Sequence, residues 1–408
     1  MDKIKEAIKK LEKYNQEHIK VENEELANQI LNIDLEQLKD LYEQTKHTVE
    51  ENVITNIEPV KAINPNRISK EELNEYIKIG EEKVKSGKYA VAIMAGGQGT
   101  RLGHNGPKGT YTLTLDSKSV SLFELIIEKL KQAQERFSIE LPCYIMTSPE
   151  NNDETIEFFE KNNYFGYKKQ NIMFFKQNEK PLLDEKGNII IGEDHLVKLA
   201  SDGNGGIFYS MAEKGVLNDM KKRNIEWVFI GSVDNLLVKY VDVLLLGLAI
   251  KKNTKIATRT IIKNSPYEKV GVLCKQNGKI KVIEYTEIPE EMRKAVDDNG
   301  EMIYGESHIM CNLFNIEAIE KASSKELKYH VAKKKSKYIN EKGELVTPTE
   351  PNCYKFEKFI FDSFGLFDEI AILRGKREED FAPIKNATGP DSPETAKKMY
   401  EEFLKLKA

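Results

Sequence analysis

A glycine-rich run directly after an apolar segment constrains the fold of this chain more than any other feature. The apolar segment spans residues 89–94, and the run over residues 95–109 contains six glycines together with Arg101 and Lys108. Glycine lets the backbone approach a ligand closely because it has no Cβ. Successive free N–H groups in such a loop form a concave anion site. The run therefore predicts a buried strand that opens into a polyphosphate-binding loop.

The spacing of these glycines differs from that of two common phosphate-binding loops. A dinucleotide-binding fingerprint has the pattern G-x-G-x-x-G, whereas three residues separate Gly99 from Gly103 here. An ATPase-type P-loop ends in Gly-Lys-Ser or Gly-Lys-Thr, whereas Lys108 lies between Pro107 and Gly109. The run thus predicts a nucleotide-binding loop of another kind. A plain flexible turn after the strand is the alternative.

Composition argues against several classes of partner. The 408 residues carry 62 basic and 66 acidic side chains and a net charge of -4. This balance gives no broad basic field for nucleic acid and no polybasic membrane signal. The longest apolar segment, 236–250, contains Lys239 and Asp242 and is too short to span a bilayer. The N-terminus is charged and has no apolar core of a signal peptide. We therefore expect a cytoplasmic protein without nucleic-acid or membrane partners.

The four cysteines support the same location. They are far apart, with no C-x-x-C pair, which predicts free thiols in a reducing compartment. They are Cys143, Cys274, Cys311 and Cys353.

From residue 87 onward, strand and helix patterns alternate. This alternation is typical of a doubly wound α/β sheet, in which ligands bind beyond the carboxyl ends of the strands. The predicted strands are 89–95, 143–146, 172–175 and 227–230, and the predicted helices are 121–137, 153–162 and 211–223. Later segments, 255–262 and 270–274, resemble strands, and Asn277-Gly278 predicts a hairpin turn into 280–285.

We divide the chain into three regions. Residues 1–86 form a helical N-terminal region, in which Ser69-Lys-Glu-Glu72 looks like a capping box for a helix to about residue 85. Residues 87–375 form the nucleotide-binding core, with a β insertion at about 255–315. Residues 376–408 form a small tail with a helix over 393–405.

Polar residues follow several predicted strands, each with a functional and a structural interpretation. Asp234 suits a Mg²⁺ ion that bridges phosphate oxygens, or else caps a helix over 235–250. The segment 202–206 suits contact with a flat base or a sugar, or is an ordinary turn. Glu284 can accept two sugar hydroxyl protons, or is an exposed strand residue. Lys358 is a charge within an aromatic run, and alternation along a half-buried element is its alternative.

Together these motifs resemble the uridylyltransferases that make UDP-sugars, most closely the eukaryotic-type UDP-N-acetylhexosamine pyrophosphorylases. The resemblance covers about residues 90 to 390 and rests on several motifs in register. They are 95–103 with 107–109, 144–148, 174–177, 202–206, 233–235, 270–272 with 284–285, 330–332, 356–359 and 383–386. The resemblance implies a Rossmann-like nucleotidyltransferase fold with a doubly wound mixed sheet, a helical N-terminal region and a small C-terminal subdomain.

The resemblance also implies a role for each matching residue. Nucleotide contacts are expected from Met94, Ala95, Gly96, Gly97, Lys108, Gln177, Gly203 and Lys358. Sugar contacts are expected from Asn204, Glu284, Tyr285 and Lys385, and Mg²⁺ binding from Asp234. The catalytic cations would be Arg101, Lys108 and Lys385.

The implied reaction joins UTP and a sugar 1-phosphate, with an N-acetylhexosamine as the sugar, and releases pyrophosphate. A phosphate oxygen is already a competent nucleophile, so catalysis rests on positioning and charge neutralisation. Two alternatives are a glucose-1-phosphate or broad-range uridylyltransferase, and a non-catalytic UDP-sugar-binding protein. The family's eukaryotic enzymes carry a longer C-terminal domain than the segment after Lys385, so we expect a monomer.

Overall fold

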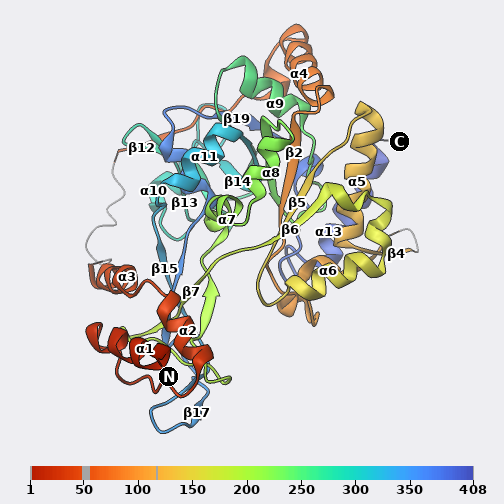
Figure 1. The fold of residues 1–408 in the computed structure, drawn as a ribbon. Helices are drawn as coiled ribbons and strands as arrows, with labels where there is room; N and C mark the ends of the chain where they lie inside the picture. The colour runs from red at the N-terminus through yellow and green to blue at the C-terminus, as the bar shows by residue number, and fades with distance from the viewer. Residues whose placement is uncertain (1, 48–55, 116–117, 408) are drawn as a thin grey trace. The chain divides into compact units, whose positions relative to one another are not determined.

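The computed structural model describes residues 2–47, 56–115 and 118–407 (Figure 1). The chain forms two compact units. The smaller unit contains Met1–Val53, Asn178–Gly206 and Leu327–Ile360, and the larger unit contains Ile54–Gln177, Ile207–Glu326 and Phe361–Ala408. Neither unit coincides with one of the regions 1–86, 87–375 and 376–408 that the sequence suggests. Each unit is made of three segments that are far apart in the sequence.

The smaller unit packs three helices against short antiparallel strands. The helices are α1 (Asp2–Lys13), α2 (Glu24–Asn32) and α3 (Leu35–His47), and α1 lies beside α2 (Figure 1). The strands are β15 (His330–Lys334), β18 (Cys353–Glu357) and β8 (Leu183–Asp184) in one sheet, with the pairs β7 (Glu179–Pro181) and β9 (Leu199–Ser201), and β16 (Tyr338–Ile339) and β17 (Leu345–Val346). Leu11, Ile30 and Leu38 of the helices share a buried core with Leu183 and Phe356. The apolar periodicity of the N-terminal region therefore marks the faces that this core buries.

The larger unit is built on a ten-stranded mixed sheet, which confirms the α/β fold class. Its main order is β1 (Ile57–Pro59), β12 (Val272–Gln276), β14 (Glu306–Asn315), β10 (Trp227–Ser232), β2 (Tyr89–Met94), β5 (Cys143–Thr147) and β6 (Ile172–Lys176). In addition, β11 (Ile256–Ile262) pairs with β14, β19 (Ala371–Arg374) pairs with β11, and β13 (Lys279–Ile283) pairs with β12. The strands β10, β2, β5 and β6 are parallel neighbours. Their carboxyl ends therefore lie along one edge of the sheet, as the alternating pattern predicts.

Helices accompany the strands of this unit, and the predicted helices near 69–85, 121–137, 153–162 and 393–405 are confirmed. The helices of the unit are α4 (Lys70–Lys85), α5 (Leu122–Phe137), α6 (Asn152–Lys161), α7 (Ile207–Glu213), α8 (Val216–Lys222), α9 (Val243–Lys251), α10 (Glu290–Lys294), α11 (Ile316–Ser324), α12 (Arg377–Asp380) and α13 (Pro393–Lys407). The hydroxyl oxygen of Ser69 accepts a hydrogen bond from the Glu72 amide at 3.1 Å, which confirms the predicted cap. Helices α4 and α9 lie side by side (Figure 1). A Cβ on Gly80 would lie 1.9 Å from the Val243 carbonyl oxygen, so glycine is what allows this close approach.

Two local predictions are wrong. The predicted helix 211–223 is two helices, α7 and α8, because the chain turns at Gly215 with a φ of +80°. No helix begins at residue 235; α9 begins later, and the Asp242 carboxylate caps it by accepting from the Leu245 amide at 3.0 Å. Asp234 is therefore not a helix cap.

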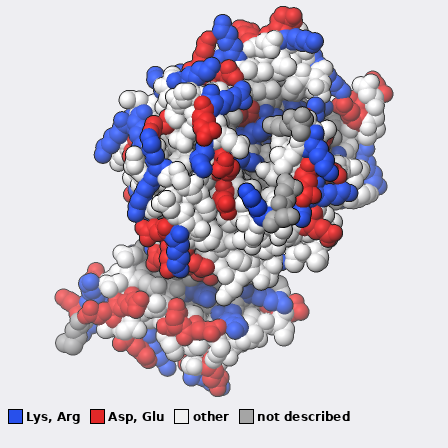
Figure 2. All heavy atoms as spheres, turned by 90° about the vertical axis from the view of Figure 1, so that its right-hand side faces the viewer, with Lys and Arg blue, Asp and Glu red and all other residues white. Residues whose placement is uncertain are grey.

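The surface and the thiols agree with the composition. Over the described residues, no helix is long and apolar enough to cross a membrane. Acidic and basic side chains are interspersed on the face that Figure 2 shows. The predicted free thiols are confirmed, and all of them are buried: Cys143, Cys274, Cys311 and Cys353.

Candidate active site

The glycine loop begins where β2 ends and is closed by its own backbone. All residues of β2 are buried, and the Ala95 amide extends the parallel pairing by donating to the Met146 carbonyl at 2.8 Å. The Lys108 amide donates to the Gly97 carbonyl at 3.0 Å, and the Gly99 amide donates to a carbonyl across the loop at 2.9 Å. Lys108 is thereby fixed beside the first turn of the loop, at the carboxyl end of the central strand.

Gln177 lies against the first glycine of the loop. It directly follows β6, and its amide donates to the Thr147 carbonyl of β5 at 2.7 Å. A Cβ on Gly96 would lie 2.7 Å from the Gln177 side-chain oxygen, so a larger residue here would displace this amide. The side chain of Gln177 is buried. Two of the predicted nucleotide contacts are therefore neighbours in the larger unit.

Asn151 supports the loop through its side chain and is not among the residues predicted from the sequence. Its side-chain amide donates to the Ala95 carbonyl at 3.1 Å and to the Gly97 carbonyl at 3.4 Å. Its side-chain oxygen accepts from the Ser148 amide at 2.8 Å, and the Asn151 amide donates to the Ser148 hydroxyl at 3.1 Å. The signal in the sequence is a Ser-Pro-Glu-Asn turn at a strand end, which is typical of such side-chain-to-backbone bonds.

Lys108 and Asp234 form an ion pair beside the loop. The Lys108 ammonium lies 3.0 Å from one carboxylate oxygen of Asp234, and the Ser232 hydroxyl donates to the other at 2.6 Å. They meet because β10 pairs in parallel with β2, with Ser232 opposite Met94. Burial acts to raise the pKa of Asp234, but Lys108, the Ser232 hydroxyl and Lys385 outweigh it and hold that pKa below its usual value. Asp234 is therefore an anionic group in a largely enclosed place.

Lys385 belongs to the same neighbourhood. Its side chain is half-buried, 3.5 Å from a carboxylate oxygen of Asp391. The preceding residue, Ile384, donates its amide to the Asp234 carbonyl at 2.8 Å. The structure thus brings Lys108, Asp234 and Lys385 together from three distant segments of the larger unit.

The remaining predicted residues of the larger unit lie on other elements. Arg101 is exposed in a short 3₁₀ turn, Thr100–Leu102, and makes no ion pair with the residues that the structure describes. Glu284 and Tyr285 follow β13 in the predicted hairpin, whose turn is confirmed by positive φ angles at Asn277 and Gly278. Tyr285 is 37% exposed. The roles of Arg101, Glu284 and Tyr285 stay predictions.

In the smaller unit, the segment 202–206 is joined to the residues around Lys358. The Lys358 amide donates to the Asp202 carbonyl at 2.7 Å, and the Gly205 amide donates to the Lys358 carbonyl at 2.9 Å. Gly203 has a φ of +89°, and a Cβ there would lie 2.3 Å from the Lys358 carbonyl oxygen. The Asn204 side-chain oxygen accepts from the Ile360 amide at 2.8 Å. Hydrogen bonds thus join the segments that contain three of the predicted contacts, Gly203, Asn204 and Lys358.

Lys358 does not continue the alternation of a strand, because β18 ends at Glu357. Its ammonium lies over the Tyr329 ring, 4.3 Å from the ring centre. The neighbouring Asp202 is 3% exposed, and its Oδ1 atom accepts no hydrogen bond from the described residues. Burial raises the pKa of Asp202 to about 6, although the charges of Lys358 and Lys180 oppose that rise. A buried carboxyl with a raised pKa beside lysines is typical of functional sites.

Comparison with known proteins supports the interpretation of these motifs. A family model described as UTP–glucose-1-phosphate uridylyltransferase matches residues 35–389. The UDP-N-acetylglucosamine pyrophosphorylase of Saccharomyces cerevisiae is 37% identical over 339 residues, which cover 80% of this chain and 71% of that protein. The UDP-N-acetylglucosamine diphosphorylase 2 of Arabidopsis thaliana is 35% identical over 367 residues, with coverage of 83% and 71%.

A solved structure agrees with the fold over nearly the whole chain. The UDP-N-acetylglucosamine pyrophosphorylase of Trypanosoma brucei, crystallised with an inhibitor, has a TM-score of 0.82 and is 29% identical. The alignment covers 98% of this chain and 84% of that one.

Proposed function

The chain belongs to the UTP–glucose-1-phosphate uridylyltransferase family, and we propose that it makes UDP-N-acetylglucosamine and pyrophosphate from UTP and N-acetylglucosamine 1-phosphate. The observation that carries this proposal is the meeting of Lys108 and Asp234 beside the glycine loop, at the carboxyl ends of β2 and β10. The relatives' names favour N-acetylglucosamine as the sugar. The description of the family model makes glucose 1-phosphate the alternative substrate.

The reaction is an in-line displacement at the α-phosphorus of UTP. A phosphate oxygen of the sugar 1-phosphate forms the new bond to that phosphorus, and the bond to the β-phosphate oxygen breaks. The attacking oxygen is anionic, so no side chain has to remove a proton. Free N–H groups of the loop, Lys108 and Lys385 would neutralise charge on the triphosphate, which lowers the barrier because these groups are held in place beforehand.

The residues at Asp234 fit a magnesium ion that is bound mainly through substrate phosphates and water. Among the described residues, no group of three or more His, Cys, Asp or Glu could hold a metal ion. Mg²⁺ commonly uses one or two carboxylates, phosphate oxygens and water. Among the residues that the structure describes, each Asp234 oxygen accepts one hydrogen bond, which leaves a lone pair for the ion. We propose that Asp234 holds Mg²⁺, which would neutralise phosphate charge.

The other predicted contacts complete the proposal. Gln177 and Gly203 would recognise the uracil, and Lys358 a phosphate. Asn204, Glu284 and Tyr285 would contact the sugar. We also propose that the enzyme acts in the cytoplasm, which its buried free thiols support.

Pyrophosphate release tests the proposal. The protein is mixed with UTP, Mg²⁺ and one of three sugar 1-phosphates, those of N-acetylglucosamine, N-acetylgalactosamine and glucose. We expect the highest kcat/KM with N-acetylglucosamine 1-phosphate. The highest value with glucose 1-phosphate would establish the alternative, and no release with any of the three would refute the proposal. As a control, Lys108→Ala should lower kcat by about a hundredfold, the typical effect of losing one preorganised charged donor.

A non-catalytic UDP-sugar-binding protein is the remaining alternative. It would bind UDP-N-acetylglucosamine in calorimetry without releasing pyrophosphate from UTP. The binding measurement therefore separates this alternative from a protein that has no role with UDP-sugars.

A further inference from the structure

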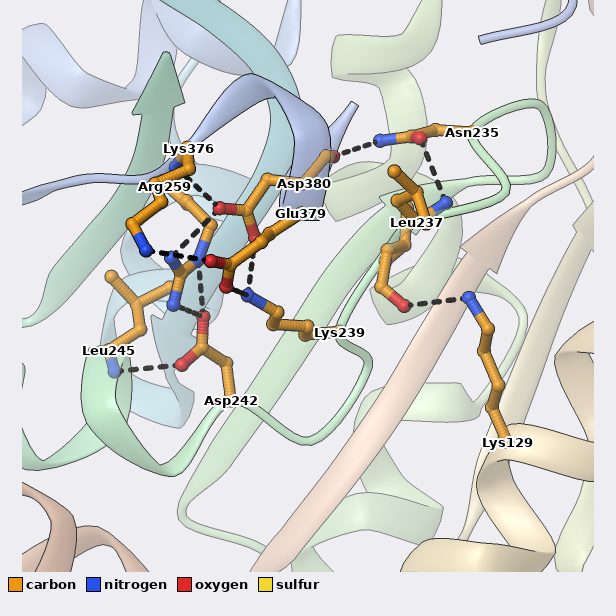
Figure 3. A network of polar contacts seen from close by, with 11 residues as sticks. Lys129, Asn235, Leu237, Lys239, Asp242, Leu245, Arg259, Lys376, Glu379 and Asp380 are labelled. Carbon is orange, nitrogen blue, oxygen red and sulfur yellow. Dashed lines mark hydrogen bonds and ion pairs between the residues drawn. The ribbon is translucent and has the colours of Figure 1, made fainter. Parts of the chain in front are cut away.

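A polar network begins at the residue after Asp234, and no step of the proposed reaction uses it (Figure 3). It joins two segments of the larger unit, residues 233–242 after β10 and residues 376–385 after β19. The first segment carries Asp234 and the second carries Lys385. The network therefore connects the two segments that carry these charged groups.

Asn235 is the residue through which the two segments are joined. It is 4% exposed, and Figure 3 shows its side chain directed toward Asp380 and Leu237. Its amide nitrogen donates to the Asp380 carbonyl at 2.8 Å. Its side-chain oxygen accepts from the amides of Ala382 at 2.8 Å and Leu237 at 3.1 Å. One side chain thus satisfies three backbone groups, on both segments.

The backbone continues this connection up to the charged residues. The Leu236 amide donates to the Ala382 carbonyl at 3.0 Å, and the Ile384 amide donates to the Asp234 carbonyl at 2.8 Å. Asn235 pairs with Pro383 as an isolated antiparallel bridge. Lys385 follows this short pairing directly, so Asn235 and its neighbours hold its backbone on one side, and the Asp391 carbonyl, which accepts from the Lys385 amide at 2.6 Å, holds it on the other.

A cluster of buried charges supports the second segment. Arg259 of β11 donates a hydrogen bond from Nε to Asp242 Oδ2 at 2.7 Å, its Nη2 lies 2.6 Å from the same oxygen, and its Nη1 lies 3.3 Å from Asp380 Oδ2. Lys239 lies 2.8 Å from the other Asp380 oxygen, so a cation lies beside each oxygen of this carboxylate (Figure 3). Burial disfavours the charged guanidinium, but the two carboxylates outweigh this and raise the pKa of Arg259. Asp380, whose carbonyl accepts from Asn235, is thereby held in one position.

We propose that Asn235 is a positioning residue, which, together with the Arg259–Asp242–Asp380 cluster, fixes Lys385 in its place beside Asp234 and Lys108. This inference rests on the proposed function, because Lys385 matters only if phosphate charge develops at this site. Asn235 acts through the backbone of residues 380–384 and has no direct role in the reaction. Its loss should therefore lower activity only as far as Lys385 is displaced.

A double-mutant cycle tests this inference. We measure kcat/KM for N-acetylglucosamine 1-phosphate at saturating UTP for the wild type, Asn235→Ala, Lys385→Ala and the double variant. We expect about a hundredfold loss for Lys385→Ala, about tenfold for Asn235→Ala, and a double variant within about threefold of Lys385→Ala alone. Independent effects would multiply to about a thousandfold, and that result would overturn the inference. Unchanged activity of Lys385→Ala would overturn it as well.

Asn171→Ala is the matched control. Asn171 is 4% exposed, and its side chain hydrogen-bonds to Glu140 and Arg223, but it precedes β6 at the amino end of the strand. Asn171→Ala should lower stability in urea without lowering kcat/KM. A comparable loss of activity in Asn171→Ala would show that lost stability alone explains the lower activity of Asn235→Ala. That result would refute the inference.

Two further outcomes are separated by the same experiment. If Asn235→Ala does not fold, the cycle is run with Asn235→Asp, which keeps an acceptor for Ala382 and Leu237 but replaces the donor to Asp380 with a carboxylate oxygen. If the wild type itself releases no pyrophosphate, the proposed function fails, and the inference fails with it. A wild type that is active with multiplying effects leaves the function standing and refutes the inference alone.

Discussion

The ionised carboxylate of Asp202 should destabilise the folded protein by an amount that depends on pH. Asp202 is 3% exposed, and burial raises its pKa from 3.8 to about 6. One pKa unit corresponds to about 1.4 kcal/mol, so the shift amounts to at most about 3 kcal/mol of lost stability. Asp202 adjoins Gly203, a predicted nucleotide contact, so this cost arises beside a candidate site residue.

The sign follows from proton binding in the two states. Below about pH 3.8 the carboxyl is protonated in the folded and the unfolded chain, and it costs nothing. Between 3.8 and about 6 the unfolded chain releases the proton first, so the free energy of unfolding falls as pH rises. Above that window both states are ionised, and the full penalty is present.

Asp202→Asn removes the charge and should reverse this effect. Urea unfolding followed by circular dichroism gives the free energy of unfolding of both proteins at several pH values. The advantage of the variant should grow from near zero at about pH 4 to as much as about 3 kcal/mol at about pH 7.5. Asp40→Asn, at an exposed position of the same unit, should show no such trend. A difference between Asp202→Asn and the wild type that does not change with pH would refute the reasoning.

Three further variants test other parts of the structure. Asp234→Asn should need a higher Mg²⁺ concentration for half-maximal pyrophosphate release; an unchanged Mg²⁺ titration would place the ion elsewhere. Arg259→Met should lose about 3–5 kcal/mol in urea unfolding, because the buried carboxylates of Asp242 and Asp380 each lose a cation, although Lys239 stays beside Asp380; a loss below about 1 kcal/mol would argue against this explanation. Gly203→Ala should lose about 1–3 kcal/mol, since its φ is positive and a Cβ would meet the Lys358 carbonyl, and it should also weaken UTP binding in calorimetry. Unchanged binding would remove Gly203 from the nucleotide site.

The parts that sequence reasoning predicted well are those set by local chemistry. The strand before the glycine run, the Ser69 cap and the Asn277-Gly278 turn each depend on a few adjacent residues, whose preferences are strong. The meeting of Gly96 with Gln177 was also predictable, because the carboxyl ends of parallel strands share one edge. Each of these features is present in the structure.

The parts that were not predicted depend on contacts between distant segments. The smaller unit combines residues 1–53, 178–206 and 327–360, and no periodic pattern within one segment indicates that they share a core. Asn235 looks like an ordinary residue after a strand, and its partners at 380–382 lie far along the chain. The break at Gly215 has a signal in the sequence that the prediction did not use, because Met211 and Val216 are five residues apart and a glycine lies between them.

A crystal structure with bound UTP tests the central claim most directly. We expect the triphosphate within hydrogen-bonding distance of free backbone amides of residues 95–109 and of the Lys108 ammonium, with uracil against Gln177. Clear density for the nucleotide away from this loop would contradict the claim that backbone amides and lysines at the carboxyl edge of the sheet carry the reaction.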